Sequence, residues 1–93
     1  MKGAQEMIEV TTASGLTLQI DEDALDDYEL LEALANQGND GISTLTVVDH
    51  LFGDQKKLVL DHCRGPKGRV SAVKVFEIVG EVLNRLQESQ SKN

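Results

Sequence analysis

Two short runs hold all the histidine and cysteine of the chain: Asp49-His50 and Asp61-His62-Cys63. A cysteine beside a histidine can act as an activated nucleophile, and all three residue types can bind zinc. With one cysteine, however, the chain lacks the paired-cysteine spacing of a structural zinc site. Each histidine is followed three residues later by a glycine (Gly53, Gly65), which predicts that each lies in the last turn of a helix. An imidazole suits the negative end of the helix dipole there, so we expect neither catalysis nor metal binding.

Two other patterns resemble ligand sites only in part. Asp21, Asp23 and Glu32 match three positions of a calcium-binding loop, but Asp26 stands where that loop needs glycine. Residues 65–69 (Gly-Pro-Lys-Gly-Arg) lack the spacing of a phosphate-binding loop and its serine or threonine after lysine. No two carboxylates are placed where one environment would favour an acid and the other a base. We therefore predict a protein that is not an enzyme and has no cofactor.

Length and composition predict one small domain. The chain has 93 residues, of which 40% are hydrophobic and only 3% aromatic, so its core must be mainly aliphatic. A chain of this size buries roughly 60% of its unfolded surface, which leaves little room for a deep cleft. We expect a single domain over residues 1–93, with an ordered core at about 6–87 and flexible tails at 1–5 and 88–93. Neither a membrane span nor a signal peptide is expected, and the single cysteine fits a reducing cytosol.

A hairpin and a first helix are predicted for the N-terminal part. Apolar residues alternate with polar ones around Ser14-Gly15, which is typical of two short strands joined by a turn. The first helix should begin with Asp26 as its N-cap, and Glu29 should complete a capping box. Gly38 should end this helix, with a loop at 39–41. The residues predicted to face the core are Tyr28, Leu31, Leu34 and Ala35.

The next segment allows two interpretations. Its β-branched residues at 42–48 favour a strand. Its larger apolar residues follow a helical period, which favours a helix over Thr44–Phe52 with Ser43 as cap. We predict the helix, because a period of 3.6 residues fits better than a period of two. The residues that should share its apolar face are Leu45, Val48, Leu51 and Phe52.

Two further helices complete the predicted fold. Asp54 should cap a short helix that Gly65-Pro66 ends, and Ser71 should cap the longest helix, Ala72 to about Gln87. The residues expected to face inward from the short helix are Leu58 and Val59. The apolar residues of the longest helix are Val73, Phe76, Val79, Val82, Leu83 and Leu86, with Val75 and Ile78 broadening the stripe. The fold class is thus mainly α with a short N-terminal β-hairpin, a small bundle of about four helices.

Charge is distributed unevenly along the chain. Residues 1–50 hold eleven acids and one base (−10), whereas residues 51–93 hold five acids and eight bases (+3). The acidic half would repel nucleic acid, so no nucleic-acid partner is expected. A chain with this asymmetry could associate with copies of itself or dock on a basic partner.

Three blocks of sequence resemble one family. The run 20–35, which contains Leu-Asp-Asp-Tyr-Glu-Leu-Leu-Glu, is similar to the opening of tail assembly chaperones from long-tailed (siphovirus-type) phages and prophages of Gram-positive bacteria. Leu51-Phe52-Gly53 and the final block 68–83 resemble the later helices of that family. The resemblance covers about residues 16–87 and rests on the order and spacing of these blocks. It departs from the family pattern at 42–48, where β-branched residues replace a more helix-favouring stretch.

This resemblance implies a non-enzymatic protein that acts while the virion is built. Such chaperones bind the tape-measure protein, and often the tail-tube protein, in the cytoplasm of the infected bacterium. They keep these proteins soluble until the tube polymerises and are absent from the mature virion. Two alternatives remain open: an acidic cytosolic regulator or adaptor that binds a basic protein, and a structural head–tail component.

Two sets of residues are candidates for partner binding. One set broadens the apolar stripe of the last helix and would supply apolar contacts: Val75, Ile78 and Val82. The other set consists of carboxylates that the helix start does not need, and it would contact a basic partner: Asp21, Glu22, Asp23 and Glu32.

Overall fold

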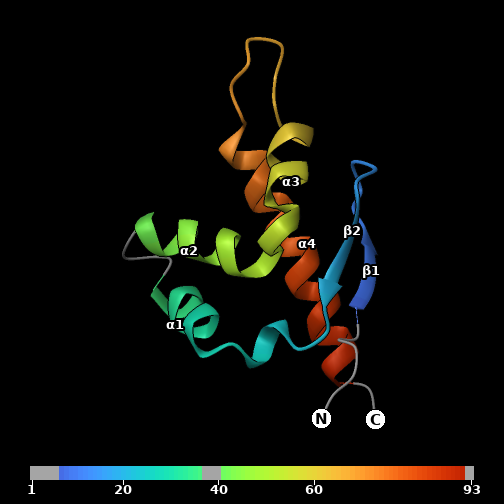
Figure 1. Ribbon diagram of the computed structural model, residues 1–93, viewed down its shortest axis with the longest axis vertical. Helices are drawn as coiled ribbons and strands as arrows, with labels where there is room; N and C mark the ends of the chain where they lie inside the picture. The colour runs from blue at the N-terminus through green and yellow to red at the C-terminus, as the bar shows by residue number, and fades with distance from the viewer. Residues whose placement is uncertain (1–6, 37–40, 92–93) are drawn as a thin grey trace.

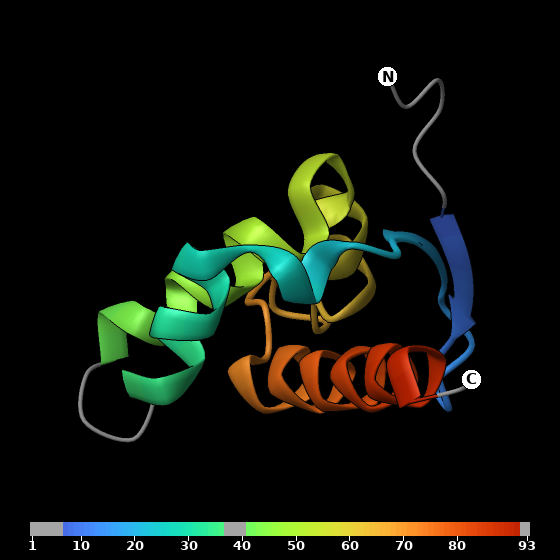
Figure 2. The ribbon, with the colours of Figure 1, turned by 90° about the horizontal axis from the view of Figure 1, so that it is seen from below.

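The computed structural model describes residues 7–36 and 41–91, and it has the predicted fold class: mainly helical, with a short hairpin at the start. The hairpin lies beside the C-terminal half of the longest helix, and the other helices lie on one side of that helix or beyond its N-terminal end (Figures 1 and 2). In chain order the elements are β1 (Met7–Thr11), β2 (Thr17–Asp21), the 3-10 turn η1 (Ala24–Asp26), α1 (Tyr28–Asn36), α2 (Gly41–Phe52), the 3-10 turn η2 (Gly53–Gln55), α3 (Lys56–His62) and α4 (Ala72–Ser91).

The hairpin forms where the alternation predicted it. β1 and β2 are antiparallel, with Val10 opposite Leu18, and Gly15 lies in the turn with a φ of +96° that favours glycine. Val10, Leu18 and Ile20 are all buried, so one face of the hairpin belongs to the core. At the tip, the backbone N–H of Ala13 donates to Glu81 Oε1 on α4 at 2.9 Å. A two-stranded hairpin is marginal alone, and packing against α4 supplies the support it needs.

The first helix begins one residue later than predicted. Asp27, not Asp26, is its N-cap: Asp27 Oδ1 accepts a hydrogen bond from the N–H of Leu30 at 3.1 Å. Asp26 instead belongs to η1, the turn that redirects the chain from β2 into α1. With the cap at Asp27, Glu29 stands two residues on rather than three, so the predicted capping box is wrong.

The buried face of α1 also differs from the prediction. Leu30 and Ala33 are the buried residues of this helix, whereas Tyr28 is 73% exposed and Leu31 45% exposed. Leu34 is half-buried and Ala35 exposed. The cause is that α1 packs on α2 and extends, with the first half of α2, past the N-terminal end of α4 (Figure 2). A helix covered on one side buries one narrow stripe. In α1 this stripe contains Leu30 and Ala33 rather than Tyr28 and Leu31. The predicted helix end at Gly38 lies outside the described residues.

Residues 42–48 are helical. They belong to α2, which begins at Gly41 rather than at the predicted Thr44. Val47, Val48, Leu51 and Phe52 are buried, and burial of this stripe outweighs the weak strand preference of the β-branched residues. Leu45, which was expected on the buried face, is 62% exposed.

The last two helices keep most of their predicted features. Ser71 caps α4, since its Oγ accepts from the N–H of Lys74 at 3.3 Å and its carbonyl from the N–H of Val75 at 3.1 Å. Asp54 lies in η2 and does not cap α3, which begins at Lys56 with no side-chain cap. Val59 is fully buried, as predicted, but Leu58 is 53% exposed.

One aliphatic core joins the hairpin to the helices. Its members come from both strands and from every α-helix, and Cys63 just after α3 is among them. α4 runs to Ser91, beyond the predicted end at Gln87, so residues 88–91 are helical rather than a tail. Among the described residues, no helix has both the length and the apolar content needed to cross a membrane.

Candidate functional site

The apolar residues predicted to bind a partner lie in the core. Val75, Ile78 and Val82 of α4 are 5%, 3% and 0% exposed. Their stripe is wide because α4 is contacted by the hairpin on one side and by the other helices on another (Figures 1 and 2). Ile78 and Val82 pack in the core and offer a partner almost no surface, whereas Val75, although buried, also borders the groove described below.

Exposed apolar side chains do occur on α2 and α4. Ile42 and Leu45 lie one turn apart on α2 and are 71% and 62% exposed. Val73 and Phe76 lie one turn apart on α4 and are 66% and 48% exposed. Large apolar side chains this exposed on two helices mark a surface suited to protein contact.

Leu45 and Phe76 line the same hollow, an apolar groove between α2, α3 and α4 with a volume of about 420 Å³. Val48, Leu60, Val70 and Val75 form most of the remaining wall. Two charged residues, Asp49 and Lys56, also line the groove, and they pair with each other at 2.5 Å between Oδ1 and Nζ. Because these two charges neutralise each other, the groove offers a mainly apolar surface.

The predicted acidic set is not part of this groove. Asp21 ends β2, Glu22 and Asp23 follow it, and Asp21 Oδ1 accepts the N–H of Asp23 at 2.9 Å, which stabilises the turn. Glu32 lies on α1 and is exposed, close to residues of α2 that include His50. The structure therefore divides the set between the start of η1 and the α1–α2 contact.

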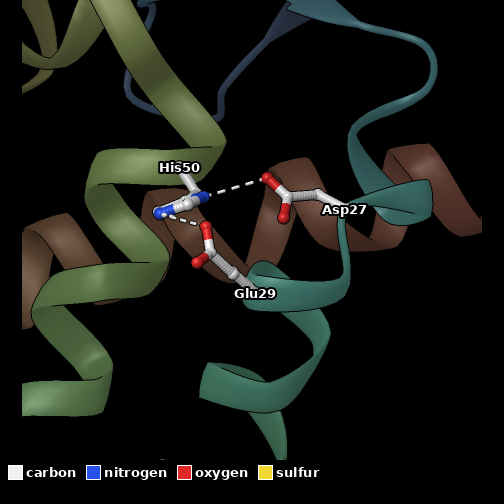
Figure 3. Close-up of side chains that lie close together, drawn as sticks. All are labelled: Asp27, Glu29 and His50. Carbon is white, nitrogen blue, oxygen red and sulfur yellow. Dashed lines mark hydrogen bonds and ion pairs between the residues drawn. The ribbon is translucent and has the colours of Figure 1, made fainter.

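A charged cluster joins α1 to α2. His50 lies in the last turn of α2, as predicted, and its Nδ1 is 2.9 Å from Asp27 Oδ2 (Figure 3). Its Nε2 is 3.8 Å from Glu29 Oε1, so the imidazole stands between two carboxylates. The hydrogen bond to Asp27 is the main cause that raises the pKa of His50, and the same bond lowers the pKa of Asp27.

Sequence reasoning missed this cluster. It placed His50 correctly at a helix end but gave it no partner, because the residues that meet it lie more than twenty positions earlier in the chain. A contact between residues this far apart in the chain cannot be predicted from a local sequence pattern. The acidic residues at the start of α1 gave the only hint, since a histidine near them would be held by their charge.

The second histidine has a structural task. Ser14 Oγ is 3.0 Å from His62 Nε2 and also 3.0 Å from Thr12 Oγ1, so these bonds hold the hairpin turn against α3. A cavity of about 500 Å³ adjoins them, lined also by Cys63, Lys74 and Glu77. Cys63 is 2% exposed, and burial raises the pKa of its thiol, which keeps it protonated and unreactive. These contacts account for the packing of the hairpin turn against α3.

Comparison with known proteins found no matching family model, no matching curated protein and no matching solved structure. Function must therefore be argued from the groove, the charged cluster and the resemblance in the sequence. Of these features, the groove is the one that exposes large apolar side chains, Leu45 and Phe76, that a partner could cover.

Proposed function

We propose that this protein is a tail assembly chaperone of a long-tailed phage or prophage of a Gram-positive bacterium. It binds the tape-measure protein, the tail-tube protein or both in the host cytoplasm, without catalysing a reaction. It holds them soluble until the tube polymerises and is left out of the mature virion. The observation that carries this proposal is the open apolar groove between α2, α3 and α4.

The groove has the form that helix-in-groove recognition needs. Two helices, α2 and α4, present exposed apolar side chains, and Leu45 and Phe76 stand where both helices reach the groove. Covering apolar surface stabilises a complex by roughly 25 cal/mol per Å² before the costs of association. An amphipathic helix of a tail protein would gain this energy by laying its apolar residues at i, i+3 and i+7 in the groove.

Charge supports the same function. The formal net charge is −7, and the excess acid lies in the first half of the chain. A chaperone that covers apolar surface on its client must keep the complex dissolved, and added acidic charge is effective for this. The acidic set at η1 and α1 can also contact basic segments of the client.

Co-expression with the tape-measure protein from the same genome tests the proposal. We expect the chaperone to raise the soluble fraction of the tape-measure protein and to co-purify with it. Phe76→Asp and Leu45→Asp should abolish both effects, since each places a charge in the groove. Leu58→Asp is the matched control, because Leu58 is also exposed but does not line the groove. Equal rescue by all variants would refute the groove as the binding surface.

An acidic adaptor for a basic protein is the second candidate, favoured by the charge of the first half. It predicts binding that weakens steeply between 50 and about 500 mM salt, because exposed charges are screened. Apolar binding in the groove should change little over that range. A structural head–tail component is distinguished by mass spectrometry of purified particles, in which the chaperone should be missing.

A further inference from the structure

We propose that Asp27, Glu29 and His50 form a binding site for a divalent transition-metal ion such as Zn²⁺, which links α1 to α2. One ligand atom from each side chain lies within 4.8 Å of the other two. The donor set mixes one imidazole with two carboxylates, a combination that zinc accepts with water filling its remaining position.

The three ligand atoms lie within 4.8 Å of one another, so small side-chain rotations would bring them to the spacing of a tetrahedral site. Bonds of about 2.0–2.2 Å to zinc place neighbouring ligand atoms roughly 3.4 Å apart. In the structure, Asp27 Oδ2 lies 2.9 Å from His50 Nδ1, whereas Glu29 Oε1 lies 3.8 Å from the other ring nitrogen, Nε2. An ion takes one ring nitrogen, so the imidazole or the Glu29 carboxylate must turn toward it. The Glu29 side chain is 74% exposed and has room to do so.

Part of the site is held in place before an ion arrives. The Asp27 carboxylate uses its two oxygens differently: Oδ1 accepts the N–H of Leu30, while Oδ2 faces His50. Carboxylates that bind metals are usually held in orientation by such hydrogen bonds. The imidazole of His50 is held toward the site by its hydrogen bond with Asp27 Oδ2 (Figure 3). The cap of α1 and the proposed site thus share one side chain.

The surrounding charge also favours a cation. With neutral imidazole the three ligands carry −2, and Glu32 lines the same hollow, whereas the charge of nearby Asp49 is balanced by Lys56. Among the residues that the structure describes, no lysine or arginine lines the hollow between α1 and α2 next to His50. An ion here would replace the proton of the imidazolium as the positive charge between the carboxylates.

Calorimetric titration of the full chain with ZnCl₂, after removal of metal by chelation, tests the site. We expect one ion per chain with a dissociation constant in the micromolar range, and a rise in melting temperature that EDTA reverses. His50→Ala and Asp27→Asn should each weaken binding at least ~10-fold. Asn is chosen at 27 because it keeps the helix cap, so loss of binding does not reflect loss of α1. Glu29→Gln provides a third variant that leaves the cap untouched.

His62→Ala is the matched control, since His62 is the other histidine and bonds Ser14 rather than carboxylates. Zinc affinity should be unchanged in this variant. Three outcomes would overturn the site: no saturable binding below about 1 mM, equal loss on changing His62, or unchanged affinity in folded His50→Ala, with circular dichroism as the check on folding. None of these outcomes bears on the groove, so the site and the chaperone function are tested separately.

Discussion

Asp27 is the side chain on which most of the α1–α2 geometry depends. Its Oδ1 caps α1 and its Oδ2 binds His50 of α2, so one residue fixes both the start of a helix and its contact with the next. The sequence places three aspartates within five positions, at 23, 26 and 27, and any of them could cap a helix. Which of them does so is decided by the length of the η1 turn and by the position of His50, neither of which is a local property.

Substitution of Asp27 separates these two tasks. Asp27→Ala removes the cap and the partner of His50, and we expect the free energy of unfolding to fall by about 1–2 kcal/mol. Asp27→Asn keeps the cap, so its free energy of unfolding should fall by less than that of Asp27→Ala. Urea denaturation of both variants measures the difference. Asp26→Ala is the matched control and should change stability by less than about 0.5 kcal/mol; a larger effect there would restore Asp26 as the cap.

The pair Asp27–His50 predicts a pH dependence, measured with chelator present so that no metal contributes. The pKa of His50 is raised, so its stabilising effect is full below its ordinary pKa of 6.5 and is lost as the pH rises through the raised value. The pKa of Asp27 is lowered, so its effect is present above its ordinary 3.8 and is lost as the pH falls further. The pair should therefore stabilise the fold most between about pH 4 and 6.5.

Thermal melts of the wild type and His50→Ala at pH 5 and pH 8 test this. Their difference should be larger at pH 5 and should shrink with added salt, since both side chains are partly exposed. A difference that grows from pH 5 to pH 8 would contradict the assignment.

At the scale of elements, helix existence could be predicted but helix orientation could not. The hairpin turn at Gly15 and the Ser71 cap depend on neighbouring residues, and the structure confirms both. The face of α1 depends on what covers it. Its sequence offers one stripe at Leu30 and Ala33 and another at Tyr28 and Leu31, and only the position of α2 decides between them. Leu45 was likewise expected on the buried face, because nothing in the sequence showed the groove.

Two substitutions on α4 test which of its apolar residues stabilise the fold and which are exposed. Ile78→Asp places a charge in the core, where Ile78 is 3% exposed, and should unfold the domain or cost several kcal/mol. Phe76→Asp, two residues earlier at 48% exposed, should leave the circular dichroism spectrum and the melting temperature almost unchanged. A folded Ile78→Asp protein that loses its partner would instead support the sequence-based prediction that Ile78 contacts a partner.

In the whole molecule, the residues that stabilise the fold are largely different from those proposed to bind a partner. The core joins the hairpin to the helices, whereas Leu45 and Phe76 are exposed and line the groove. The charge difference between the two halves of the chain also predicts weak self-association at low salt. Light scattering at two salt concentrations measures it, and an apparent mass that does not fall as salt rises would contradict it.

The central claim is that the groove between α2, α3 and α4 binds the tail protein. Methyl NMR of the full chain, titrated with a soluble fragment of the tape-measure protein, tests it most directly. We expect chemical-shift changes concentrated at Leu45, Leu60 and Val70, which line the groove. Leu58, exposed on α3 outside the groove, should not shift. Saturable binding with shifts confined to Leu58 or to the hairpin, and none in the groove, would contradict the account.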